Sequence, residues 1–389
     1  MKRSIMAMAV LPALAAVLAT AALDQPAGPP ESPGDAGRGG TEGKPAAALL
    51  RPGSPAPSLT VEKWIAGAPV ASFERGKVYV VFFWAVWAPQ SATLVPKLSS
   101  LQKEFAGKGV TIVGVASPDK RNNTLERVEK FVADREGQIA YAVAWDKART
   151  TSEAYLDASE APFIPWAFVI DKEGKIAFCG SPHEYDLGLV LDRLFAGTWD
   201  ITKGPGELDE INQRTDRMLK SVEPRTSTAP REAWEELKRF EADLPRVARG
   251  LIPASLKAEL MIRNEVEGAE SFAAGVVDAL IAEDGRMIGG MNRRSSTYLN
   301  QIAWAIVDPA LKPKARNLDL ALKAAEAANA QTSEKEPAIL DTLARVCWLK
   351  GDKVRAVELQ KKAIRLAGED EAELKKELEE TLKEYQGLK

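Results

Sequence analysis

The chain has 389 residues, of which 45% are hydrophobic and 28% are charged, and its 52 basic and 55 acidic residues give a formal net charge of −3. This balance gives no electrostatic reason to expect a nucleic-acid partner. Two cysteines, Cys179 and Cys347, and one histidine, His183, are too few for a structural zinc site, which needs about four such ligands, and haem or iron–sulfur ligation is equally disfavoured. We therefore expect no metal and no cofactor.

The N-terminal residues 1–22 have the pattern of a secretory signal peptide. The basic pair Lys2-Arg3 precedes an apolar run over residues 5–22, and Ala19-Thr20-Ala21 fits the small-x-small cleavage rule. The alternative is an uncleaved membrane anchor, because the run is just long enough to span a bilayer. Its alanine content and Pro12 favour cleavage. We therefore predict export to the periplasm or another extracytoplasmic space, with membrane contact only if the segment stays uncleaved.

The rest of the chain divides into four parts by composition and periodicity. Residues 23–50 are dense in proline and glycine and cannot bury enough apolar surface to offset their chain entropy, so we predict a disordered linker. Residues 51–198 alternate strand and helix patterns. Residues 199–290 form a helical middle region, and residues 291–389 form a second helical domain.

Residues 51–198 contain the patterns of an α/β domain. Residues 77–83 are a β-branched and aromatic run, typical of a strand buried on both faces, and Pro89 suits the first turn of a helix. In chain order, we predict strands at 59–64 and 77–83, a helix from 89, a strand at 109–116, a helix at 123–133, a strand at 139–144, a helix at 150–156, strands at 166–170 and 175–179, and a helix at 186–195. This order predicts a mixed sheet flanked by helices.

Three motifs in this domain resemble the thioredoxin-like domain of the redoxin group, which includes TlpA/ResA and AhpC/TSA relatives. Residues 80–91 (VVFFWAVWAPQS) stand at the strand-to-helix turn where the family has Phe-Trp-Ala-x-Trp-Cys-x-x-Cys. Ile164-Pro165 matches the family's cis-proline, and residues 168–178 (FVIDKEGKIAF) match the following strand–turn–strand. The resemblance implies a thioredoxin-like fold, thiol–disulfide or peroxidase chemistry in the family, and a shallow groove that holds an extended segment of a partner.

The sequence departs from the family at both redox cysteines, which are replaced by Ala88 and Ser91. The first cysteine works because the helix N-terminus lowers its pKa and yields a thiolate, and the second resolves the mixed disulfide. Ala88 has no nucleophilic atom, and no base is evident beside Ser91, which is better explained as a helix-start hydroxyl than as a partner of His183. The degenerate site positions implied by the resemblance are Trp87, Ala88, Pro89, Gln90, Ser91, Ile164 and Pro165, and we predict that none is catalytic.

Cys179 is the residue through which redox chemistry could still occur. It ends a predicted strand, away from any helix N-terminus, so a half-buried structural thiol is the favoured interpretation. A disulfide with Cys347 is disfavoured because the two cysteines fall in different predicted domains. We therefore predict a redox-inactive binding or scaffold module for a polypeptide partner. The alternatives are oxidoreductase or antioxidant activity through Cys179 and a hydrolase with an unrecognised site.

Strand patterns vanish after residue 200, and the remainder reads as helices. Residues 234–244 have amphipathic spacing, residues 256–283 form a helix interrupted near Gly268 and Gly275, and residues 201–205 and 224–230 resemble linkers. Further on, small residues at the spacing of a tetratricopeptide repeat predict two antiparallel helix pairs. The residues that fit this spacing are Leu343, Ala344, Gly351, Ala356 and Ala363. An earlier copy of the repeat pattern has Ala303-Trp304, Ala321 and Ala328. The alternative is a plain helical bundle, and residues 369–385 would cap either array.

Overall fold

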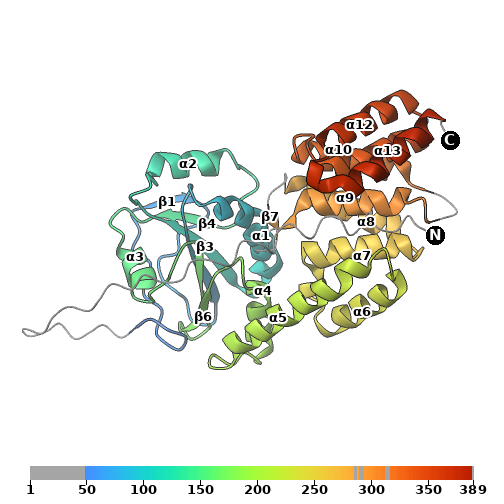
Figure 1. Cartoon of the computed structure of the whole chain (residues 1–389). Helices are drawn as coiled ribbons and strands as arrows, with labels where there is room; N and C mark the ends of the chain where they lie inside the picture. Colours follow the sequence, from blue (N-terminus) through green and yellow to red (C-terminus); the bar gives the residue numbers. More distant parts are fainter. Residues whose placement is uncertain (1–48, 284–286, 289–292, 312–315, 388–389) are drawn as a thin grey trace, which may run out of the picture.

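The computed structural model describes residues 49–283, 287–288, 293–311 and 316–387. They form a mixed β-sheet with helices on both faces, which we call the sheet domain, followed by an all-helical region (Figure 1). The predicted signal peptide lies outside the described residues, as does the predicted linker except for Leu49 and Leu50.

The sheet domain has six strands in the spatial order β1-β4-β3-β2-β5-β6. Their bounds are β1 Lys63–Ala66, β2 Val78–Trp84, β3 Val110–Ala116, β4 Ala142–Trp145, β5 Trp166–Ile170 and β6 Ile176–Gly180. β2, β3 and β4 are parallel, whereas β1, β5 and β6 join by antiparallel pairing. Since parallel strands end at one edge of the sheet, the segments that follow β2, β3 and β4 meet there. This carboxyl edge is where the predicted site lies.

β2 is the centre of the core, and all seven of its residues are buried. Alternate side chains face two apolar clusters, because successive residues of a strand point to opposite faces. Val80, Phe82 and Trp84 pack with α1, α2 and α4, and Val81 and Phe83 pack on the other face with the segment that follows α3. The bounds are α1 Pro89–Phe105, α2 Leu125–Ala133, α3 Thr150–Ser152 continued by a π-helical turn at Glu153–Asp157, and α4 Leu187–Ala196. The predicted α/β class is confirmed.

The first predicted strand is misplaced. We expected residues 59–64, but β1 covers Lys63–Ala66. The backbone groups of Thr60 form hydrogen bonds with a side chain and not with a neighbouring strand. The Thr60 N–H donates to Thr151 Oγ1 at 2.8 Å, and the Thr60 carbonyl accepts from the same hydroxyl at 2.8 Å. Pairing with β4 therefore begins only at Lys63.

The all-helical region contains nine longer helices among the described residues. They are α5 Gly204–Val222, α6 Pro230–Asp243, α7 Leu251–Arg263, α8 Ala269–Ala282, α9 Ser295–Val307, α10 Leu318–Gln331, α11 Pro337–Lys350, α12 Lys353–Leu366 and α13 Ala372–Gln386, with a two-stranded ribbon of β7 Met287–Ile288 and β8 Arg293–Arg294. The predicted break at Gly268 is confirmed, but the one at Gly275 is wrong. Gly275 lies inside α8 on its exposed face, where a glycine costs only about 1 kcal/mol relative to alanine.

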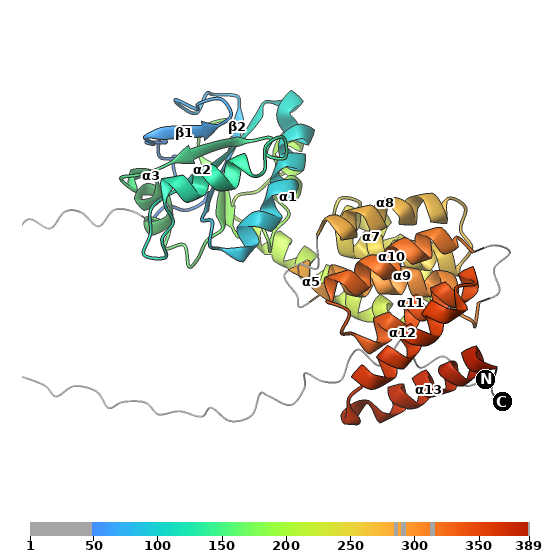
Figure 2. The same ribbon diagram turned by 90° about the horizontal axis from the view of Figure 1, so that it is seen from above.

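The predicted helix pairs are present, and successive helices from α9 to α13 pack side by side (Figure 2). The small residues named from the sequence lie between them: Ala303, Ala321, Ala328, Ala344, Ala356 and Ala363 are all fully buried. Gly351 ends α11 with a φ of 91°, a conformation that glycine adopts without a Cβ penalty. Assignment of these pairs to the tetratricopeptide class remains a prediction.

Arg246, in the turn after α6, attaches the helical region to the sheet domain. Its Nε donates to Asp192 Oδ2 at 2.6 Å, a further bond reaches Glu104, and the guanidinium lies 5.3 Å from the centre of the Phe105 ring. Gly188 makes room for it, since a Cβ there would lie 2.2 Å from Arg246 Nη1. The two parts of the chain are therefore joined by a side-chain contact as well as by the connection through α5 (Figure 1).

Candidate functional site

The turn between β2 and α1 forms the centre of the candidate site. Ala88 is the N-cap residue of α1 and is only 3% exposed, and Ser91, three residues later, is 4% exposed. The Ser91 N–H donates to the Ala88 carbonyl at 2.9 Å and closes the first turn. The backbone of Pro89 and Gln90 opens the helix, and their side chains lie outside the described part of the structure.

The second predicted motif lies beside this turn. The Ile164-Pro165 peptide bond is cis, as the resemblance implies. Phe83 pairs with Trp166 in the β2–β5 ladder, so the next step of the register places Pro165 opposite Trp84. The structure therefore brings the two predicted motifs together at the carboxyl edge of the sheet.

Neither position of the former redox pair carries an activated nucleophile. Ala88 offers only a methyl group, and Ser91 Oγ is buried with no hydrogen-bond partner among the described residues. A serine hydroxyl attacks only when a base removes its proton, and no base contacts Ser91 in this part of the chain.

The two cysteines are free thiols that lie apart from this turn. Cys179 is half-buried in β6 and pairs across the ladder with Phe168, and Cys347 is buried in α11. Burial raises the pKa of both thiols. Both are therefore held in the protonated form, which is the poorer nucleophile.

Trp87 is held in place by a carboxylate and an arginine that no sequence motif indicated. Trp87 Nε1 donates to Asp119 Oδ2 at 2.5 Å, and Asp119 Oδ1 accepts from the N–H groups of Arg121 at 2.8 Å and Asn123 at 3.1 Å. The Arg121 guanidinium lies over the Trp87 ring, 4.3 Å from its centre. The signal available in the sequence was the run of turn-forming residues SPDKRNN directly after β3.

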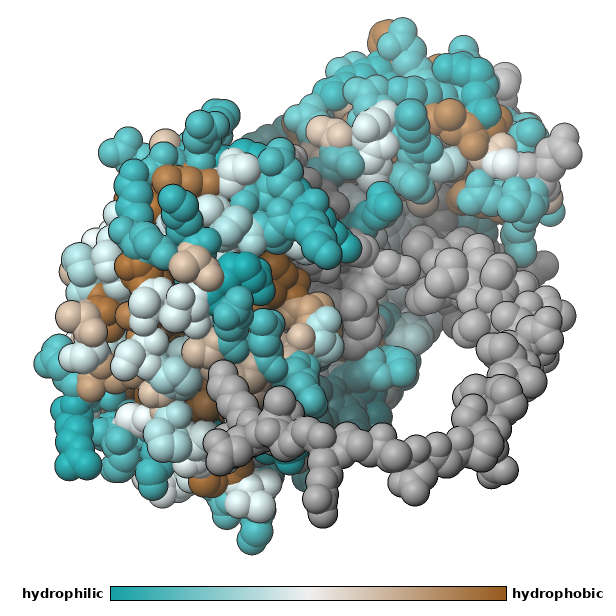
Figure 3. All heavy atoms as spheres, turned by 90° about the vertical axis from the view of Figure 1, so that its left-hand side faces the viewer, coloured by the Kyte–Doolittle hydropathy of each residue, from teal (hydrophilic) through white to brown (hydrophobic). Residues whose placement is uncertain are grey.

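Phe163 and Trp166, which flank the cis Ile164-Pro165 bond in sequence, form an aromatic pair. Phe163 is 48% exposed, and its ring packs edge to face on Trp166 with 5.4 Å between the centres. Trp166 is half-buried, and its Nε1 has no partner among the described residues. On the face of the molecule drawn in Figure 3, apolar side chains form several separate groups between hydrophilic ones. The pair gives the site an apolar contact surface.

The comparisons with known proteins identify the domain that carries this site. The profile of the AhpC/TSA family matches residues 52–179. These residues form an AhpC/TSA-family domain. The chain is 28% identical over 206 residues to Protein FixW of Rhizobium leguminosarum, a match that covers 49% of this chain and 91% of FixW.

Two further proteins are similar to about a third of the chain. Thiol-disulfide oxidoreductase ResA of Bacillus subtilis is 26% identical over 124 residues, which cover 32% of this chain and 64% of ResA. Among solved structures, a thiol-disulfide isomerase from Corynebacterium glutamicum superposes with a TM-score of 0.31 at 23% identity, covering 36% of this chain and 96% of that one.

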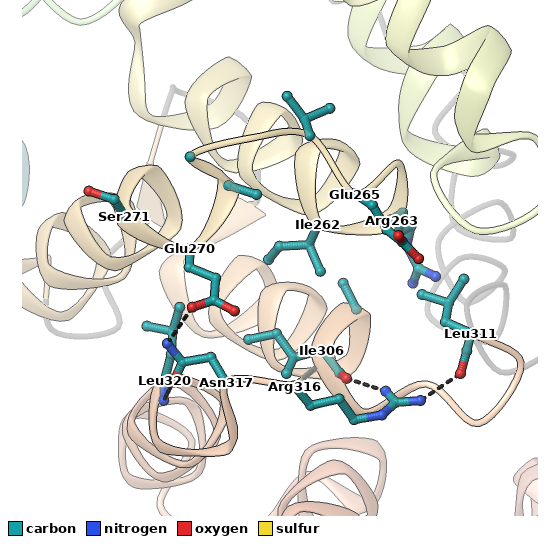
Figure 4. A pocket seen from close by; sticks show the side chains of 14 residues that line it. Ile262, Arg263, Glu265, Glu270, Ser271, Ile306, Leu311, Arg316, Asn317 and Leu320 are labelled. Carbon is teal, nitrogen blue, oxygen red and sulfur yellow. Dashed lines mark hydrogen bonds between the residues drawn. The ribbon is translucent and has the colours of Figure 1, made fainter. Parts of the chain in front are cut away.

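The helical region contains a separate cavity of about 560 Å³ between the turn after α7, the start of α8, the end of α9 and the start of α10 (Figure 4). Its two arginines are already engaged. Arg263 donates to Glu259 at 2.8 Å and to Asp308 at 2.9 Å, and Arg316 donates to three backbone carbonyls. Both guanidinium groups therefore stabilise the helical region and are not available to bind an anion.

No described helix is both long and apolar enough to cross a membrane. In the same part of the chain, no group of three or more histidine, cysteine, aspartate or glutamate side chains is arranged to hold a metal ion.

Proposed function

We propose that this protein is an exported, redox-inactive relative of the thiol–disulfide oxidoreductases that binds an extended polypeptide segment at the former redox site. The observation that carries the proposal is Ala88 at the N-cap of α1, where a family nucleophile would stand. The surrounding surface is kept: Trp87 is held in place by Asp119, and Phe163 remains exposed beside Trp166. A recognition surface without its nucleophile supports binding rather than exchange.

The helical region supports the same function by giving the AhpC/TSA domain a large, rigid neighbour. Packed helix pairs present extended surfaces to partners. Arg246 and α5 hold that surface beside the AhpC/TSA domain. We propose that the helical region acts as the scaffold part of the molecule.

The alternative function is dithiol or peroxide chemistry through Cys179. Two observations weigh against it: burial raises the pKa of the Cys179 thiol, and the residue lies within β6 rather than at a helix N-terminus. Cys179 also has no second cysteine near it to resolve a mixed disulfide, because Cys347 lies in α11.

The first prediction concerns this absence of redox activity. With dithiothreitol as the electron source, the purified protein should reduce a model protein disulfide no faster than dithiothreitol alone, because no thiolate stands at residue 88. Turnover clearly above that background would contradict the proposal. Loss of such turnover in Cys179→Ala would then assign the activity to Cys179.

The second prediction concerns the aromatic pair. Substituting Phe163→Ser should weaken the binding of a random pool of labelled peptides by about tenfold, because exposed aromatic anchors contribute a large share of binding energy. Fluorescence polarisation on the full chain provides the measurement. Val354→Ser, at a site in α12 that is 72% exposed, is the matched control and should leave binding unchanged. Equal losses in both variants, or no binding by the unmodified chain, would overturn the proposed binding site.

A further inference from the structure

The segment that follows β3 is fixed against the candidate site by a set of hydrogen bonds. Asn123 is 1% exposed; its side-chain oxygen accepts from the Val86 N–H at 3.0 Å, and its side-chain nitrogen donates to the Ser117 carbonyl at 2.7 Å. Asp119 bonds Trp87 and the backbone of Arg121 from the same segment. Arg121 therefore extends from a segment whose position relative to Trp87 is set.

Arg121 itself remains available for a ligand. Its side chain is exposed, its guanidinium lies 4.3 Å from the centre of the Trp87 ring, and it forms no ion pair within the part of the chain that the structure describes. Stacking on an aromatic face uses the flat side of a guanidinium and leaves its N–H edges free, in the forked geometry that fits a carboxylate. Both oxygens of the neighbouring Asp119 already accept hydrogen bonds from Trp87, Arg121 and Asn123.

The N-terminus of α1 adds positive potential at the same place. Trp87 directly precedes the N-cap residue Ala88, which has no side-chain oxygen to cap the helix, and the first turn contains no acidic residue. Pro89 has no N–H, and the Ser91 N–H is bonded to the Ala88 carbonyl, so the positive end of the helix dipole is what attracts negative charge here. A second observation is an unpartnered polar group in the same turn: Ser91 is 4% exposed, and its hydroxyl has no hydrogen-bond partner among the described residues.

We infer that Arg121 and the open N-terminus of α1 bind the carboxylate of an aspartate or glutamate side chain in the partner, so that the site selects acidic polypeptide segments. This inference rests on the proposed function, since it names the chemistry of the same partner. The carboxylate takes the place that a thiolate would occupy beside this helix end. A charge-assisted, two-pronged bond of this kind also fixes the register of an extended segment.

Two peptide pools test the inference on the full chain. Each contains capped peptides of about ten residues, which span roughly 30 Å when extended and carry no terminal charge. The central position of each peptide is aspartate or glutamate in one pool and asparagine or glutamine in the other. Every other position is drawn at random from the non-acidic amino acids. We expect the acidic pool to bind about tenfold more tightly in low salt and to lose this preference at about 1 M salt.

Arg121→Gln should remove the preference for acidic peptides, so that the acidic and the amide pools bind the variant equally. Arg135→Gln is the matched control, because Arg135 also stacks on an aromatic ring, that of Phe131, at 3.7 Å. Equal binding of both pools to the unmodified chain would overturn the carboxylate site and leave the proposed function standing. A preference that persists in Arg121→Gln would overturn the role of Arg121, and failure of both pools to bind would overturn the proposed function as well.

Discussion

The double variant Ala88→Cys/Ser91→Cys should reduce a protein disulfide at a rate well above the dithiothreitol background, whereas the natural sequence should not. The reason is local: residue 88 is the N-cap of a long helix whose first turn has no acidic residue. A thiol placed there lies at the positive end of the helix, which lowers its pKa to below about 7.5. The gain from no thiolate to a populated thiolate is the largest functional change that we expect from any substitution.

The geometry of the turn also suits a disulfide between the two positions. The Ser91 N–H already donates to the Ala88 carbonyl at 2.9 Å, so the two residues are held within one turn. From the rise and radius of an α-helix, the Cα atoms of residues three apart lie about 5 Å from one another, within the roughly 4.4–6.8 Å between Cα atoms that a disulfide accepts. We therefore expect the double variant to oxidise without unfolding the start of α1.

Alkylation rates measured across pH report the pKa of the new thiol, and the disulfide-reduction assay reports its activity. Ala88→Cys alone should form a trapped mixed disulfide, because it can attack but cannot be resolved. Ser91→Cys alone should remain inactive, which controls for a second thiol as such. If the thiol at residue 88 titrates near about 8.5, like an unperturbed cysteine, and the double variant stays silent, then this turn is not a former redox centre.

The sheet domain was predictable because its elements are specified by local sequence. Residues 78–83 are all β-branched or aromatic, which is typical of a strand covered on both faces, and β2 covers Val78–Trp84 with every residue buried. The family motif then located the turn at Ala88 and the cis-proline at Pro165, and the ladder between β2 and β5 brings them together. At this edge Trp84 is buried, and Trp87 and Trp166 are half-buried.

The features that the sequence did not reveal depend on contacts between distant residues. α5 was missed because its Gly204-Pro205-Gly206 start resembles a linker. Gly204 is needed for packing rather than for a turn, since a Cβ there would lie 2.6 Å from the Trp199 ring. The hydrogen bond from Trp87 likewise joins residues 87 and 119, and no local pattern shows which carboxylate an indole will meet. Local propensity determines the elements, but tertiary contacts determine these pairings.

A buried carboxylate in the helical region leads to the last prediction. Asp341 of α11 is 2% exposed, and its Oδ1 accepts from Gln360 Nε2 of α12 at 2.7 Å. The same Gln360 nitrogen also donates to the Leu378 carbonyl of α13 at 3.1 Å, so it serves two acceptors. Burial outweighs the hydrogen bond from Gln360 and raises the pKa of Asp341 to about 6. At neutral pH the Asp341 carboxyl is therefore mostly ionised, although its burial favours the neutral form.

Asp341→Asn should raise the free energy of unfolding at pH 8 by about 2–3 kcal/mol, because it replaces the buried charge with a neutral amide of the same shape that still accepts from Gln360. The sign follows from the raised pKa. The contribution of Asp341 to the stability of the natural protein is fully present below the unfolded pKa of about 3.9 and is lost as the pH rises through about 6. The advantage of the variant should therefore shrink as the pH falls and vanish near pH 4.

Urea unfolding followed by helical circular dichroism at several pH values measures both the size and the pH dependence of this effect. Asp319→Asn is the control, because the Asp319 side chain is 90% exposed, and its replacement should change stability by less than about 0.5 kcal/mol at any of these pH values. A loss of stability in Asp341→Asn at pH 8 would contradict the prediction. It would mean that neighbouring groups stabilise the ionised carboxylate by more than the free-energy cost of burying its charge. A gain that is the same at every pH would show that the amide improves packing and that the charge of Asp341 is not the cause, since only removal of a charge makes the gain depend on pH.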